Sequence, residues 1–97
     1  MSAAEPSAFA QVVEVQARVP EILGSVAMEP ILYARAPGAF IEDALRAVSR
    51  ARALLEQAQH ALVLEAANTR SLTRREMGVA TGIATSTIQR WVNEASR

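Results

Sequence analysis

Residues 71–97, SLTRREMGVATGIATSTIQRWVNEASR, constrain the fold of this chain more than any other stretch. Thr73 and Glu76 are spaced as in a capping box, where the Thr hydroxyl accepts a hydrogen bond from the Glu amide and the Glu carboxylate accepts one from the Thr amide. Leu72 and Met77 occupy the two positions of a hydrophobic staple, which fixes how the chain enters a helix. These signals together predict a helix that begins just after Thr73.

This helix must be short, because Gly82 follows after about two turns. Glycine adopts the left-handed conformation that closes many helices without strain from a Cβ atom. Beyond it, Ile88, Trp91 and Ala95 are spaced by three and then four residues, as on one face of a second helix. A short helix, a glycine-containing turn and a longer helix make a helix-turn-helix.

The stretch resembles the helix-turn-helix of phage repressors, resolvase-type recombinases and many small bacterial regulators, in which the pattern is L-T-x-x-E-[IL]-A-x-x-[TL]-G-[IV]-S-x-S-T-[IV]-x-R-W. About a quarter of the chain is covered. Two positions depart from the pattern: Gly78 replaces the usual Ala where the two helices touch, and Ala84 replaces the Ser that caps the second helix, which leaves that cap to Thr85 or to water. The residues that match in register are Leu72, Thr73, Glu76, Met77, Thr81, Gly82, Ile83, Ser86, Thr87, Ile88, Arg90 and Trp91.

The resemblance implies that the second helix contacts DNA. A purely structural helix pair needs apolar residues such as Ile88 and Trp91, and we expect Trp91 to lie in the core rather than to stack on a base. It does not need polar residues at the start and along one side of the second helix, where a docked helix meets base edges. Gln suits adenine, and Arg suits guanine or phosphate. The two arginines at the start of the first helix would face a phosphate strand, unless they are only solvated. The candidate DNA-binding residues are Thr73, Arg74, Arg75, Thr85, Ser86, Thr87, Gln89, Arg90 and Asn93.

The formal net charge of zero hides an asymmetry between the two halves of the chain. Residues 1–45 contain two arginines and six acidic residues, whereas residues 46–97 contain eight arginines and four glutamates. The basic half is the half that holds the helix-turn-helix, as binding to a phosphate backbone requires. A split that serves only solubility is the alternative.

Residues 1–38 form an acidic N-terminal segment whose apolar residues suggest short helices. Spacings of three and four residues run from Phe9 to Val26, and Pro20 interrupts them, so we expect a helix over 8–18 and a second short helix that opens at Pro20. The alternation of valines with polar residues over 13–19 also allows a short, half-buried strand. Gly24 and Pro30 break the pattern, and Ala-Pro-Gly at 36–38 reads as a linker.

A long amphipathic helix should begin near Ala39 or Phe40 and end near Ala67, with Asn68 as its left-handed C-cap. At 1.5 Å per residue its length would be about 40 Å. Its apolar face serves either as an intramolecular core or as the seam of a dimer, and the sequence leaves both open. The residues expected on this face are Ile41, Ala44, Leu45, Val48, Ala51, Leu55, Ala58 and Leu62.

Several classes of function find no support. The chain has no cysteine, and its single histidine, His60, has no second ligand at metal-binding spacing. Glu42 and Asp43 are adjacent and diverge on a helix, so they make a poor catalytic pair, and no phosphate-binding or nucleophile motif is present. We therefore expect no enzyme, cofactor or metal. The chain also lacks a signal-peptide pattern and a membrane-spanning apolar run, and we expect a cytoplasmic protein with no membrane partner.

We therefore predict an all-α fold with two parts: the acidic segment of residues 1–38, and residues 39–97 with the long helix and the helix-turn-helix. The predicted function is sequence-specific binding to double-stranded DNA, as a small transcriptional repressor of phage, plasmid or actinobacterial type. A homodimer would give two recognition helices roughly 34–36 Å apart and an inverted-repeat operator. The alternatives are a recombination or transposition accessory protein, and a protein-interaction module such as an antitoxin or a sigma-binding adaptor.

Overall fold

The computed structural model describes residues 7–26 and 30–97, which form helices and no strand. The all-α prediction is confirmed, and the strand considered for residues 13–19 is wrong. No helix in the described ranges is both long enough and apolar enough to cross a membrane. The helices are α1 (Ala8–Gly24), α2 (Pro30–Arg35), α3 (Pro37–Thr69), α4 (Arg74–Thr81) and α5 (Thr85–Ala95).

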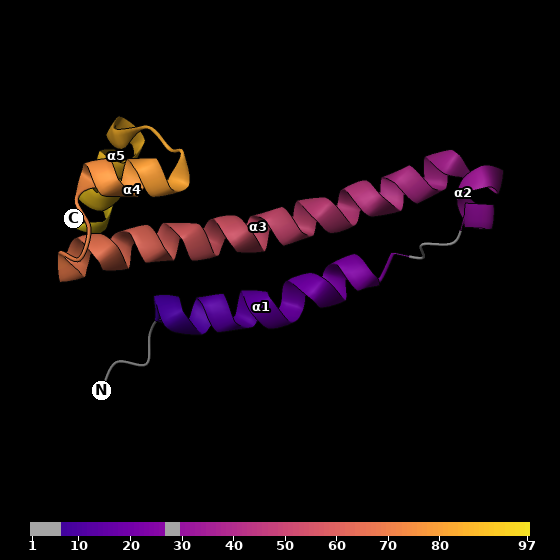
Figure 1. Cartoon of the computed structure of the whole chain (residues 1–97), viewed down its shortest axis with the longest axis horizontal. Coiled ribbons are helices and arrows are strands. Elements are labelled where there is room, and N and C mark those ends of the chain that lie inside the picture. The colour runs from indigo at the N-terminus through magenta and orange to yellow at the C-terminus, as the bar shows by residue number, and fades with distance from the viewer. Residues whose placement is uncertain (1–6, 27–29) are drawn as a thin grey trace.

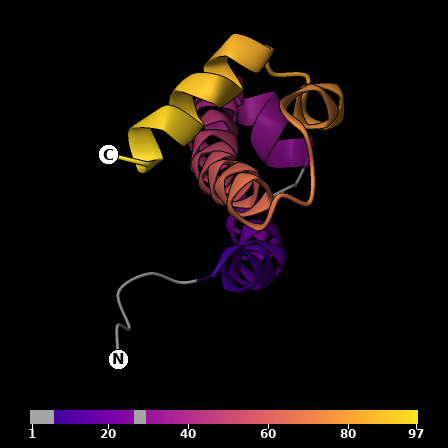
Figure 2. The same cartoon turned by 90° about the vertical axis from the view of Figure 1, so that its left-hand side faces the viewer.

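The helix α3 is the axis of the molecule (Figure 1). α1 runs antiparallel to it along one side, while α4 and α5 lie against its C-terminal end on the opposite side (Figures 1 and 2). The short α2 packs near the start of α3, where the rings of Tyr33 and Phe40 meet edge to face at a centroid distance of 5.3 Å. The resulting molecule is elongated, with extents of 52 × 34 × 21 Å.

Helix α1 continues through Pro20, so the predicted break at that residue is wrong. A proline inside a helix removes one amide donor and leaves the carbonyl four residues earlier without its usual partner. Here that carbonyl belongs to Gln16, an exposed residue, so water can satisfy it. Val19 and Ile22 pack against α3 on either side of the proline and hold both halves of the helix in line.

Helix α3 exceeds the predicted bounds at both ends. Pro37 belongs to its first turn, where a proline loses no hydrogen bond. At the other end the left-handed residue is Arg70, with φ 57°, and not Asn68 as predicted. The amides of Arg70 and Ser71 donate to the carbonyls of Ala67 and Ala66, which is a Schellman closure two residues later than expected.

The predicted apolar face of α3 is divided into two. Its alanine edge is buried against α1: Ala51 of the predicted face forms a cluster with Ile22 and with Ala47, which the prediction did not include. The partly buried Val19, Val26 and Leu54 extend this cluster. Small side chains allow two helix axes to approach closely, so the contact centres on the alanines. The larger residues of the predicted face point outward, with 45–62% of each exposed. These residues, called here the α3 row, are Ile41, Leu45, Val48, Leu55 and Leu62.

The apolar row predicted for α1 is also divided. Ala8 and Ile22, the buried residues of α1, lie outside that row, and Phe9 and Leu23 within it are 75% and 44% exposed. Val19 and Val26 of the same row pack against the α1–α3 cluster. Part of the apolar row of α1 therefore lies at the surface.

Candidate nucleic-acid interface

A second core cluster anchors the α4–α5 unit to α3. Met77 of α4 and Ile88 of α5 are 2% and 0% exposed and meet Val63 of α3. Ala66, Ala67, Ile83 and Trp91 are partly buried around them. Because one residue from each of the three helices meets at this point, α5 is held with one face inward and the opposite face free.

The predicted capping box at the start of α4 is present. The amide of Glu76 donates to the Thr73 hydroxyl over 3.1 Å, and the amide of Thr73 donates to Glu76 Oε1 over 2.9 Å. Hydrogen bonding of the Glu76 carboxylate to the Thr73 amide first, and to the Thr73 side chain second, lowers the pKa of Glu76. Leu72 and Met77, the residues of the predicted staple, both line a groove between α1, α3 and α4.

The turn between α4 and α5 closes on Gly82, as predicted. Gly82 has φ +74°, and its amide donates to the carbonyl of Gly78 over 2.9 Å. The Thr81 hydroxyl donates to the carbonyl of Met77 and accepts from the amide of Ile83, which fixes the path of the chain after the helix. A Cβ atom on Gly78 would lie 3.3 Å from the Ile83 carbonyl oxygen, so a small residue is needed where α4 meets the turn.

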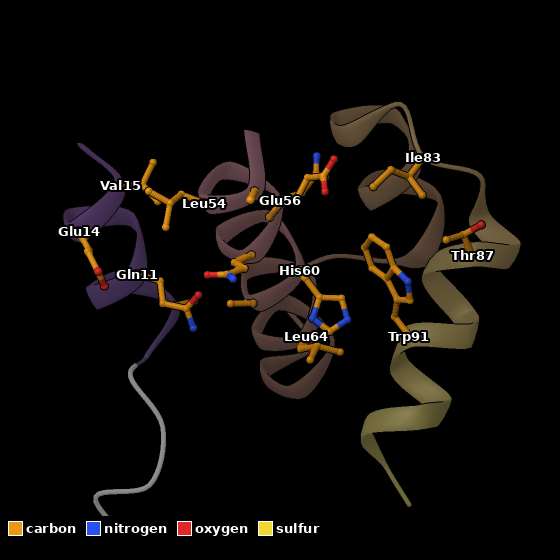
Figure 3. Close-up of a pocket in the computed structure, with 15 residues that line it drawn as sticks. Gln11, Glu14, Val15, Leu54, Glu56, His60, Leu64, Ile83, Thr87 and Trp91 are labelled. Atoms are coloured by element: carbon orange, nitrogen blue, oxygen red, sulfur yellow. The ribbon is translucent and has the colours of Figure 1, made fainter. Parts of the chain in front are cut away.

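The free face of α5 carries most of the predicted DNA-binding residues. The N-cap residue of α5 is Ala84. Within the described range 30–97, neither Thr85 nor another side chain caps the start of this helix. Its first amides therefore point to the surface, where an anion is favoured. Thr87 is only partly exposed and lies beside Ile83 and Trp91, away from the free face (Figure 3). The exposed residues are Thr85, Ser86, Gln89, Arg90 and Asn93.

A hydrogen-bonded chain links α4 to the free face of α5. Arg74 Nε donates to Gln89 Oε1 over 3.0 Å, and Gln89 Nε2 donates to Asn93 Oδ1 over 2.8 Å. The side-chain amide of Gln89 is thereby oriented, and it keeps one N–H and one oxygen lone pair for a ligand. The spacing of Gln89 and Asn93 by four residues was readable from the sequence, but nothing in the sequence indicated the contact with Arg74 across fifteen positions.

The arginines at this surface keep their charge available. Arg74 is partly exposed at the start of α4, and Arg75 beside it is exposed. Arg90 lies 3.9 Å from Glu94, an exposed pair that contributes little and does not hold the guanidinium in place. Thr73, the remaining predicted residue, is exposed but uses its hydroxyl for the capping box.

On the other side of α5, Trp91 borders an open groove of about 1250 Å³ between α1, α3 and α5 (Figure 3). Trp91 packs against the second core cluster, as predicted for it. Its ring also meets the ring of His60 edge to face, with centroids 4.7 Å apart, a contact that sequence reasoning missed. Ala95, predicted to share the buried face of α5, is exposed.

No group of three or more potential metal ligands occurs in the part of the chain that the structure describes.

Comparison of the chain with protein-family models, with curated proteins and with solved structures finds no match. The residues and geometry of the α4–α5 unit are therefore the basis for inferring function.

Proposed function

We propose that the protein binds double-stranded DNA through the free face of α5, as a small sequence-specific transcriptional regulator in the cytoplasm. The observation that carries this proposal is the orientation of Gln89. An exposed glutamine on a helix surface loses side-chain entropy when it is fixed by two neighbours. Gln89 is nevertheless held in one geometry, with one donor and one acceptor left free. A free donor and acceptor on one amide are what bidentate contact with adenine N7 and N6 uses.

The surroundings of Gln89 supply the phosphate contacts that a protein needs to hold a base-reading side chain in the groove. Arg90 follows Gln89 on α5, Arg75 follows Arg74 on α4, and both are exposed. The uncapped start of α5 presents backbone amides. Contacts of this kind position a protein on the duplex without reading sequence. Arg74 can use its terminal nitrogens on a phosphate while Nε stays on Gln89, so that positioning and base reading are coupled.

Two other functions would use the same helices. A recombination or transposition accessory protein would also bind DNA, and the resemblance of residues 71–97 to resolvases is compatible with it. An antitoxin or a sigma-binding adaptor would place the α4–α5 unit against a protein. The net positive charge of residues 70–97, with five arginines and two glutamates, favours a nucleic acid over an average protein surface.

Fluorescence anisotropy of labelled duplex DNA at increasing salt tests the proposal. We expect affinity to fall linearly on a log–log scale as salt rises, because each neutralised phosphate releases about 0.9 counterion. Arg75→Gln should lower that slope by about one unit on any sequence. Arg46→Gln serves as the matched control, since Arg46 lies near the start of α3, away from the α4–α5 unit, and pairs with Glu42 and Asp43. If wild-type protein binds no duplex at low salt, the DNA-binding proposal is wrong. Binding of the α4–α5 unit to a protein partner then becomes the favoured function.

A further inference from the structure

The outward apolar residues of α1 and α3 lie on one face of the α1–α3 hairpin. A groove of about 610 Å³ lies between α1, α3 and α4, and its lining includes Val12 and Gln16 of α1 and Leu55 and Leu62 of α3. Phe9 and Leu23 continue the helical row of Val12 and Gln16 along α1. The α3 row likewise continues from Leu55 and Leu62 towards the start of α3, so that both rows border a single long face.

The spacing of the α3 row is that of a coiled-coil seam. Arg52 and Gln59 fill the two gaps in the row. With them, the spacing from Ile41 to Leu62 alternates between four and three residues, which is a repeat of 3.5 residues over three heptads. A repeat of 3.5, rather than 3.6, keeps a row facing a partner helix along its whole length. Within the described residues, α1 packs against the alanine edge and leaves this row 45–62% exposed.

The area of this face matches what a stable pair of small proteins buries. At about 30 Å² per exposed carbon, the exposed fractions of the α3 row with Phe9 and Leu23 give roughly 500 Å² of apolar surface. Homodimer interfaces are about 65% apolar, so the corresponding interface is roughly 800 Å² per copy, the standard size.

We infer that a second copy of this chain covers the face, with the two α3 helices antiparallel across a two-fold axis beside Arg52. A second copy offers the same 3.5-residue row, and two α1–α3 hairpins face to face make a four-helix bundle. The formal net charge of zero gives the two copies no overall repulsion. Arg52 lies at the middle of the row and pairs with Glu56, so its charge is already balanced at the axis.

The antiparallel arrangement sets the distance between the two α4–α5 units, a consequence that rests on the proposed DNA binding. Val63, which carries the α4–α5 unit, lies eleven residues beyond Arg52. At 1.5 Å per residue, doubling that distance separates the two units by about 33 Å along α3, close to the roughly 34–36 Å between successive major grooves. In one copy, α1 and the α4–α5 unit lie on opposite sides of α3 (Figure 2). The inferred two-fold axis therefore leaves both α4–α5 units on the same side of the pair.

Equilibrium sedimentation of the whole chain at tens of micromolar tests the pairing. Wild-type protein should sediment at twice its mass of 10.4 kDa. Leu45→Glu should sediment at the single mass with unchanged helical circular dichroism, because Leu45 is exposed in one copy. Val79→Glu is the matched control, since Val79 is 82% exposed on α4 outside the row, and it should remain paired. A monomeric wild type, or a Leu45→Glu variant that remains paired, overturns the inference.

Disulfide trapping tests the antiparallel arrangement, and the absence of native cysteine makes single-cysteine variants unambiguous. Arg52→Cys should oxidise to a covalent dimer, because both copies place this residue at the axis. Ile41→Cys and Leu62→Cys alone should not, since each would lie about 30 Å from its symmetry mate, but a mixture of the two should cross-link. Efficient self-coupling at all three positions would show parallel helices and overturn the arrangement. A monomer that still binds DNA overturns the pairing alone, whereas a dimer that ignores DNA overturns the proposed function alone.

Discussion

Replacing Arg74 by lysine should reduce the base discrimination of the protein while leaving its electrostatic attraction to DNA intact. Lysine keeps the positive charge at the start of α4 but lacks the Nε–H that Arg74 donates to Gln89 Oε1. Without that donor, the Gln89 amide can rotate by half a turn and exchange its oxygen and nitrogen. Only one of the two orientations fits the adenine edge.

The size of the effect has two limits. If the two amide orientations become equally populated, the competent fraction falls by half, which costs about 0.4 kcal/mol of discrimination. If the hydrogen bond also contributes its usual net free energy, the loss rises to about 1.5 kcal/mol. Because both side chains are at the surface, we expect a two- to tenfold loss of preference between the best site and the same site with the adenine replaced.

Competition binding at fixed salt, between the best site and the same site with the adenine replaced, measures the ratio of the two affinities directly. Arg75→Lys is the matched control, because Arg75 lies next to Arg74 in the first turn of α4 but is not part of the hydrogen bonds that lead to Gln89. Its discrimination should equal that of wild type, and both variants should keep the wild-type salt slope. Equal discrimination by Arg74→Lys and Arg75→Lys would show that Arg74 does not orient Gln89 on DNA.

Three further predictions concern the stability of the fold. Ile88→Ala should lower the free energy of unfolding by about 2–5 kcal/mol in urea, because Ile88 is fully buried, while Ile31→Ala at an exposed site should change it by about 0.5 kcal/mol or less. Arg70→Gly should raise the melting temperature, with a gain of about 0.5–1 kcal/mol, because a residue with φ 57° is strained unless it is glycine; a decrease would contradict the assigned cap. The lowered pKa of Glu76 means that its stabilisation is complete above the ordinary glutamate pKa and is lost as the pH falls through its folded value, so Glu76→Gln should flatten the acid limb of the stability–pH curve.

The local chemistry of residues 71–97 could be predicted from the sequence because it is local. The capping box joins Thr73 to Glu76, and the left-handed Gly82 follows from the one residue type that adopts this conformation freely. Both signals involve atoms a few residues apart, so distant parts of the chain do not change them. For α3, the pattern predicted the helix but not its closure, since the helix continues through Asn68 and Thr69 and Arg70 takes the left-handed conformation.

The choice of packing face could not be predicted, because it depends on pairs of helices. The apolar arc of α3 is broad enough for both the alanine edge and the α3 row to serve as a core. Which of them meets α1 is decided by how closely the two axes can approach, and the small side chains Ala47 and Ala51 allow the closer contact. Similarly, Val19 and Ile22 hold both sides of Pro20 against α3, a contact that the local sequence does not encode. The Arg74–Gln89 contact depends on the angle between α4 and α5, which no spacing encodes.

The most direct test of the account is the sequence preference of Gln89→Ala. Duplexes are selected from a random pool by wild-type protein, and the affinities of wild type and variant are then compared on the selected site, on each single base-pair substitution, and on random DNA. We expect the variant to lose about 1–3 kcal/mol on the selected site, to lose its preference at one adenine-containing position, and to bind random DNA as wild type does. Equal weakening on the selected and the random duplexes would contradict the claim that the free face of α5 reads bases.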